Sequence, residues 1–142
     1  TMTAPNTIAT SATPVHHNPL TELLVDDDSF QLEMISEVMT SLGVSDITTV
    51  DSGEQALQHL SGQERFNLML LDLHMPGMDG FKFMDALTKV GYAGALIIVS
   101  GQSDDVMLAA TMVAKLRRFT LLGTVHKPAS LAAVSSLLAK LG

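Results

Sequence analysis

The sequence predicts an α/β fold in which five buried parallel strands alternate with amphipathic helices. Short apolar runs recur along the chain, and each is followed by a stretch whose apolar residues have helical spacing. The runs are continuously apolar, which is typical of parallel strands that are buried on both faces. A sheet covered by helices on both sides is therefore the architecture that this pattern favours.

Each element has a signal of its own. Strands are expected over residues 23–25, 47–50, 67–71, 95–99 and 121–125, and the helices that follow them over 30–42, 54–60, 81–90, 104–116 and 131–141. Gly43 should end the first helix, because glycine is favoured just past a helix terminus. The second strand is rich in β-branched residues, which favour extended backbone.

Length and composition indicate one domain. A chain of 142 residues suits a single core, and a hydrophobic content of 46% excludes a disordered chain. Residues 1–20 have no helical or strand periodicity and are expected to form a flexible tail, with the folded domain over residues 21–142. A metal site at His16 and His17 is the less favoured interpretation of this tail, since no further ligand lies nearby in sequence.

Charge and cysteine content narrow the function classes. A net charge of -7 argues against direct binding of nucleic acid, and the lack of cysteine excludes thiolate chemistry. No apolar run approaches the roughly 20 residues of a membrane span, and the N-terminus does not have the pattern of a secretory signal. We therefore expect a cytoplasmic protein without membrane contact.

Polar residues follow the apolar strands at the points where these end. They are Asp26, Asp27 and Asp28 after the first strand, Asp72 after the third, Ser100 after the fourth and Lys127 after the fifth. In open parallel sheets, active sites lie beyond the carboxyl ends of the strands. We therefore expect these side chains to gather at one edge of the sheet.

Such a cluster suits phosphoryl chemistry. Clustered carboxylates raise each other's pKa unless a cation neutralises them, and Mg²⁺ is a cation that prefers such oxygen ligands. The ion also lowers the charge barrier for attack of a carboxylate on phosphorus, while Lys127 and Ser100 could bind other phosphoryl oxygens. Each residue alone also has a structural interpretation: Asp28 as a helix N-cap, Ser100 as a loop residue and Lys127 as a surface lysine. The combination on three strand ends favours the functional interpretation.

Four segments, in chain order, resemble the motifs of receiver domains in two-component signalling: LLVDDDSF, LMLLDLHMPGMDG, LIIVSGQ and VHKP. The resemblance covers residues 21–142. It implies a flavodoxin-like sheet with strand order 2-1-3-4-5, and a phosphorylation-dependent regulatory switch rather than an enzyme. It also implies a histidine kinase or phosphotransfer protein as phosphodonor. An output domain or partner, or a homodimer, would use the fourth-helix and fifth-strand surface.

The resemblance also assigns roles at the metal site. Asp72 would be the phosphoacceptor and a Mg²⁺ ligand, Asp27 a direct ligand and Asp26 a ligand through water. His74 would bind the ion through its backbone carbonyl. The segment 75–77 would then turn the chain into the next helix.

The remaining roles concern the phosphoryl group. Ser100 and Lys127 would contact it, and the side chains of His74 and Gln102 would tune its lifetime. The sequence departs from the family at Thr124, where many receivers carry a switching aromatic residue.

A second departure is the segment between Ser100 and Lys127, which is longer than in most receivers. The stretch AATMVAKLRRFTLLGTVHKP resembles receivers joined to cyclic-di-GMP phosphodiesterase domains of the EAL type. Its basic residues Lys115, Arg117 and Arg118 suit a helix C-terminus, with a partner contact as the alternative.

Three other functions remain to be weighed. A binding module that no longer uses phosphate should have a damaged acidic pair or lack the lysine, and neither is seen. A phosphatase of the haloacid-dehalogenase type needs a carboxylate two residues after Asp72, where His74 stands. A flavodoxin-like electron carrier would need a first loop with hydroxyls and free amides for the flavin phosphate, whereas this loop is acidic.

Overall fold

The computed structural model describes residues 19–74 and 77–141, in which five parallel strands form one sheet in the order β2-β1-β3-β4-β5. The strands are β1 (Thr21–Val25), β2 (Asp46–Val50), β3 (Leu68–Asp72), β4 (Ala95–Ser100) and β5 (Thr120–His126). The helices are α1 (Ser29–Ser41), α2 (Gly53–Ser61), α3 (Gly80–Val90), α4 (Asp104–Leu116) and α5 (Leu131–Leu138), and a short 3-10 helix, η2 (Ala139–Leu141), follows α5. The predicted fold class and strand order are confirmed.

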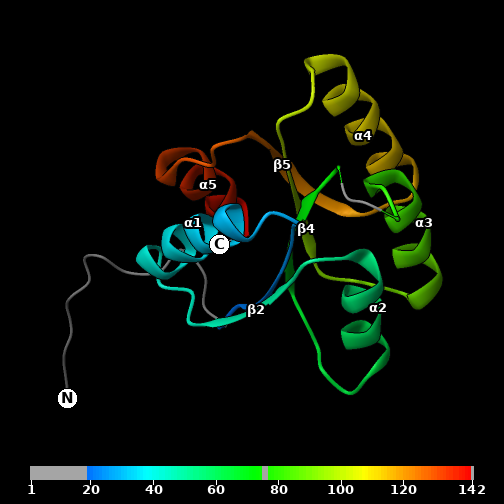
Figure 1. Ribbon diagram of the computed structural model, residues 1–142, viewed down its shortest axis with the longest axis horizontal. Helices are drawn as coiled ribbons and strands as arrows, with labels where there is room; N and C mark the ends of the chain where they lie inside the picture. Colours follow the sequence, from blue (N-terminus) through cyan, green and yellow to red (C-terminus); the bar gives the residue numbers. More distant parts are fainter. Residues whose placement is uncertain (1–18, 75–76, 142) are drawn as a thin grey trace.

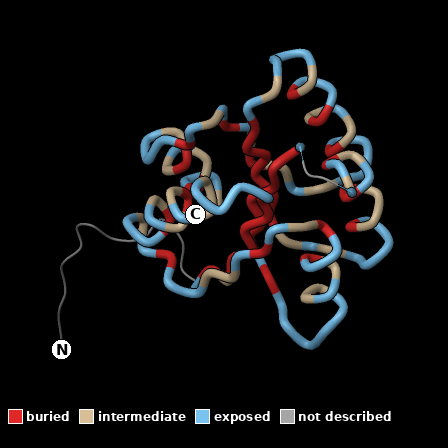
Figure 2. The backbone as a smooth tube through the Cα atoms, viewed as in Figure 1, coloured by how far each residue is buried: buried red, intermediate tan, exposed pale blue. Residues whose placement is uncertain are grey.

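Helices cover both faces of the sheet. Figure 1 shows α1 and α5 on one side and α2, α3 and α4 on the other. The strands form the buried centre between these two layers, as the red segments in Figure 2 show. Right-handed crossovers between parallel strands account for this division of the helices, because the chain reverses its direction of travel along the sheet after β2.

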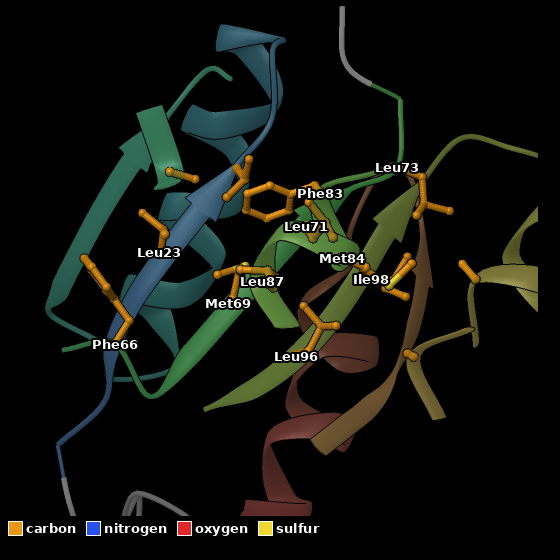
Figure 3. Close-up of a cluster of buried hydrophobic side chains, with 14 of the residues drawn as sticks. Leu23, Phe66, Met69, Leu71, Leu73, Phe83, Met84, Leu87, Leu96 and Ile98 are labelled. Atoms are coloured by element: carbon orange, nitrogen blue, oxygen red, sulfur yellow. The ribbon is translucent and has the colours of Figure 1, made fainter. Parts of the chain in front are cut away.

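The sheet separates two hydrophobic cores, because successive residues of a strand point to opposite faces. On the α2–α4 side, Phe83, Met84 and Leu87 of α3 are completely buried against strand residues such as Met69 and Leu71 (Figure 3). The α1 and α5 side has its own core. Its buried members include Leu24, Ile35, Leu70, Ile97 and Val134.

A β-bulge in β5 changes which residues face each core. Leu96 of β4 pairs with Leu121, but the next residue, Ile97, pairs with Gly123. Leu122 is therefore the extra residue, and it is buried on the α1 and α5 side. A Cβ atom on Gly123 would lie 2.6 Å from Cδ2 of Leu137, so close packing of α5 on this strand requires glycine.

The opposite edge of the sheet is held by Asn67, which precedes β3. Its Oδ1 accepts a hydrogen bond from the Thr21 amide at 2.8 Å, and its Nδ2 donates to the Pro19 carbonyl at 3.2 Å. Leu20, between these two residues, is buried. The first described residues are thus tied to the start of β3.

Some expectations concern residues outside this description. Most of the expected tail, with His16 and His17, and the turn expected at Met75 and Pro76 lie outside the described residues. Every helix within residues 19–74 and 77–141 falls short of the length and apolar character that a membrane span requires.

Candidate functional site

The polar strand ends predicted from the sequence meet at the carboxyl edge of the sheet. Val25 of β1 pairs with Leu71 of β3, so Asp26 and Asp72 follow at the same level of neighbouring strands. Asp26 and Asp72 are 2% and 4% exposed, whereas Asp27 is exposed. Asp26, Asp27 and Asp72 each offer an oxygen within 4.8 Å of the others. Parallel pairing thus brings together carboxylates that are far apart in sequence.

Lys127 neutralises part of this charge. Its Nζ lies 2.7 Å from Oδ2 of Asp26 and 3.4 Å from Oδ1 of Asp72. Burial of Lys127 by itself would lower the pKa of its ammonium group, but the two carboxylates outweigh this effect and raise it. Lys127 is therefore a fixed positive charge at the end of β5.

Asp72 has a perturbed carboxyl group. Burial, and next the charge of Asp26, raise its pKa to about 6, while Lys127 and a hydrogen bond from the His74 amide act in the opposite direction. That hydrogen bond reaches Oδ1 of Asp72 at 3.3 Å. A further cation beside this carboxylate would favour its ionised form.

The carboxylates fit a divalent cation. Three carboxylate ligands close together are the donor set that hard cations such as Mg²⁺ prefer. In addition, Oδ2 of Asp26 is buried without a hydrogen bond of regular geometry, although the ammonium group of Lys127 lies close to it. A buried oxygen with unused acceptor capacity suits metal coordination, either directly or through water.

Asp28 stands apart from this cluster. Its side chain accepts a hydrogen bond from the Phe30 amide at 3.0 Å and caps the N-terminus of α1, as expected. Its own amide donates to Oδ1 of Asp26 at 2.9 Å. Asp28 therefore supports the site by orienting the carboxylate of Asp26.

Ser100 and Gln102 lie on the loop between β4 and α4. The Ser100 side chain is completely buried, and its hydroxyl accepts a hydrogen bond from the Gln102 amide at 2.9 Å. The Lys127 amide donates to the Ser100 carbonyl at 3.0 Å, so the ends of β4 and β5 are adjacent. Gln102 is half-buried and His74 is exposed, so the two predicted lifetime-tuning side chains lie at the rim of the site.

The departures from the family pattern also have defined places. Thr124 pairs with Ile98 of β4 and is exposed. Of the basic cluster at the end of α4, Arg117 forms an ion pair with Asp85 of α3 at 2.8 Å. This pairing gives Arg117 a structural role.

One unusual residue was not singled out from the sequence. Glu22 of β1 is completely buried, and both its carboxylate oxygens lack a hydrogen-bond partner among the described residues. Burial raises its pKa to about 8. It precedes Leu23, where the strand was expected to start, so the signal was an acidic residue directly beside an apolar run. Its charge also raises the pKa of Tyr92, after the larger effect of burial.

Comparisons with known proteins agree with this geometry. A probable chemotaxis protein CheY of Rhizobium etli is 34% identical over 87 residues, which are 58% of this chain and 64% of that protein. A response regulator receiver protein of Anaeromyxobacter sp. is 30% identical over 116 residues, which are 81% of this chain and 45% of that protein. The chain thus spans less than two thirds of the length of either relative.

Solved structures share the fold. A CheY-like response regulator receiver domain from Methylobacillus flagellatus superposes with a TM-score of 0.72 at 22% identity, covering 88% of this chain and 100% of that one. The family model for the response regulator receiver domain matches residues 23–138. This chain therefore belongs to the family of response regulator receiver domains, regulatory domains of phosphorylation-dependent signalling.

Proposed function

We propose that this receiver domain accepts a phosphoryl group on Asp72 and thereby switches a signalling output. The observation that carries the proposal is the contact of one ammonium group with two buried carboxylates, since Lys127 lies 2.7 Å from Asp26 and 3.4 Å from Asp72. A fixed cation beside a buried nucleophilic carboxylate is the arrangement that phosphoryl transfer requires.

Asp72 supplies the attacking oxygen. Its Oδ1 is held by the His74 amide and faces Lys127, which leaves Oδ2 for attack on phosphorus. The new bond joins this oxygen to phosphorus, and the bond from phosphorus to the donor's leaving group breaks. Lys127 then neutralises a phosphoryl oxygen, so the domain assists its own phosphorylation and dephosphorylation.

Asp26, Asp27 and Asp72 would hold Mg²⁺, with Asp27 as a direct ligand, Asp26 acting through water and the His74 carbonyl as a further ligand. The ion, when bound, offsets the negative charge of the phosphoryl group and the carboxylates. The mutual approach of the three carboxylates and the unused acceptor capacity of Asp26 support this assignment.

The signal would leave the site through Ser100. Its hydroxyl holds the Gln102 amide, so rotation of this hydroxyl toward a phosphoryl oxygen would release the loop that leads into α4. Two packings of this loop would then differ in population with and without phosphate. Because Thr124 on β5 is exposed, the α4 and β5 surface would change without an aromatic rotation. His74 and Gln102 at the rim would control access of water to the phosphoryl group.

The partners follow from this chemistry. A histidine kinase or phosphotransfer protein would donate the phosphoryl group, in the cytoplasm, to a domain that spans residues 21–142. An output domain or a separate protein would bind the α4 and β5 surface. An output domain of the EAL type is one candidate, because of the resemblance of residues 109–128.

The test is labelling of Asp72. The wild-type chain is incubated with Mg²⁺ and radiolabelled acetyl phosphate, and it should take up one phosphoryl group that is lost in the Asp72→Asn variant. The matched control is Asp28→Asn, two residues from Asp26, because asparagine also caps helices well and the helix should remain intact. This control should be labelled like the wild type.

A complementary measurement uses beryllofluoride with Mg²⁺ as a mimic of the phosphoryl group. Amide NMR shifts should cluster at Asp27, Asp72, Ser100 and Lys127 and extend into α4 and β5. Stoichiometric labelling of Asp72→Asn, or an unchanged spectrum of the wild type, would refute the proposed switch.

A further inference from the structure

The outer face of α4 carries an exposed apolar ridge. Leu108, Met112 and Leu116 follow one another at four-residue intervals, so their side chains form one row along the helix. They are 60%, 57% and 80% exposed. Single exposed apolar residues are common on monomers, whereas a continuous row of large ones marks a binding surface. The opposite face of α4, with Ala110 and Ala114, is completely buried against the domain.

The ridge is symmetric about its centre. Leu108 and Leu116 lie at equal distances along the helix from Met112. If a second α4 lies antiparallel with Met112 on a twofold axis, Leu108 of one copy meets Leu116 of the other. The same arrangement places Asp105 of one copy next to Arg118 of the other. A surface that complements itself in this way is the requirement for a symmetric dimer.

The charges at the two ends of the ridge are available for such contacts. Asp105 lies in the first turn of α4 and Arg118 just beyond its last turn. Neither forms an ion pair with another residue in the ranges that the structure describes. Arg117, by contrast, is already paired with Asp85. The acidic end of one helix and the basic end of another are therefore complementary.

A groove lies at the C-terminal end of the ridge, between α3 and α4. It has a volume of about 580 Å³ and is lined by Thr88, Val113, Leu116, Arg117 and Arg118. In the antiparallel arrangement the second copy's Leu108 reaches this groove. An apolar side chain that enters a pocket at the centre of an interface is a typical anchor of binding.

We propose that a second copy of this chain docks on the ridge and forms a symmetric dimer through antiparallel α4 helices. The contact uses the outer face of α4 and its flank toward α3. It therefore differs from the α4 and β5 surface assigned above to the output, and leaves that surface accessible. Because the ridge and its charges are present without phosphate, the dimer does not depend on phosphorylation of Asp72.

The first test is the oligomeric state of the whole chain, measured by sedimentation velocity over a series of concentrations without phosphate analogues. The wild type should show a monomer–dimer equilibrium. Met112→Glu should weaken the dimer by at least about 100-fold, because it buries two unpaired carboxylates at the twofold axis. Leu131→Glu, at an exposed apolar residue at the start of α5, is the matched control and should dimerise like the wild type.

The second test exchanges the charges. Asp105→Arg and Arg118→Glu should each weaken self-association by about tenfold, because each places like charges opposite one another twice. A mixture of the two variants should recover dimers, since the introduced arginine of one copy then meets the introduced glutamate of the other, and the second contact is native. This recovery distinguishes a direct contact from damage to the fold.

Three results would overturn the proposal. They are a wild-type chain that is monomeric at all concentrations, a dimer that survives Met112→Glu, and a mixture of charge variants that associates no better than each variant alone. A dimer that Leu131→Glu disrupts while Met112→Glu leaves it intact would place the interface at α5 instead.

Discussion

Replacement of Glu22 by glutamine is expected to remove much of the pH dependence of this protein's stability near neutral pH. The side chain of Glu22 is completely buried in β1, and neither of its carboxylate oxygens has a hydrogen-bond partner among the described residues. Burial raises its pKa from 4.5 to about 8. The folded protein thus keeps Glu22 protonated at a pH at which the unfolded chain releases the proton.

The direction of the effect follows from proton linkage. Between the unfolded pKa of 4.5 and the folded pKa of about 8, the folded state binds more protons than the unfolded state. The free energy of unfolding therefore falls as pH rises through this range. At about 1.4 kcal/mol for each pH unit, the full loss is roughly 5 kcal/mol. About 2 kcal/mol of it falls between about pH 6.5 and about pH 8.5.

The other perturbed groups act outside this window. The pKa of Asp72 is raised to about 6, so its contribution is lost mainly at lower pH. The pKa values of Tyr92 and Lys127 are raised from already high values, so these groups stay protonated throughout. Glu22 is therefore the carboxyl group whose titration dominates between about pH 6.5 and about pH 8.5.

The assay is urea unfolding followed by far-ultraviolet circular dichroism at both pH values, in the presence of a chelator. The wild type should lose about 2 kcal/mol between them, and Glu22→Gln should lose much less, because a neutral amide of similar shape replaces the acid. Glu37→Gln, at an exposed position of α1, is the control and should behave like the wild type. Equal pH dependence of Glu22→Gln and the wild type would refute the assignment of this proton to Glu22.

Three further substitutions test the packing around the site and at the ends of elements. Arg118→Gly should raise the free energy of unfolding by about 1 kcal/mol in urea titrations, because Arg118 has a left-handed φ of 64° at the end of α4, where glycine is favoured. Lys127→Met should lower it by about 3 kcal/mol in a chelator, because Asp26 loses its partner, and added Mg²⁺ should restore part of the loss. Asn67→Ala should accelerate hydrogen exchange of the Thr21 amide and cost about 1 kcal/mol, since it removes two hydrogen bonds; unchanged exchange would contradict this role.

The sequence by itself determined the fold class and the members of the acidic site. The apolar strands are read directly from composition, because a strand buried on both faces has no polar alternation. The site residues follow from them, since parallel strands place Asp26, Asp72 and Lys127 at one edge whatever the details of packing. The N-cap at Asp28 was likewise predictable, because it depends on neighbouring backbone amides only.

Tertiary structure alone decided features that depend on distant chain segments. The sequence marks Lys127 as a cation, but only the folded chain places it closer to Asp26 than to Asp72. The bulge that makes Leu122 an extra residue of β5 depends on pairing with β4. The complete burial of Glu22 depends on the packing around β1. Desolvation and pairing are sums over neighbours from separate elements, so no local pattern of residues contains them.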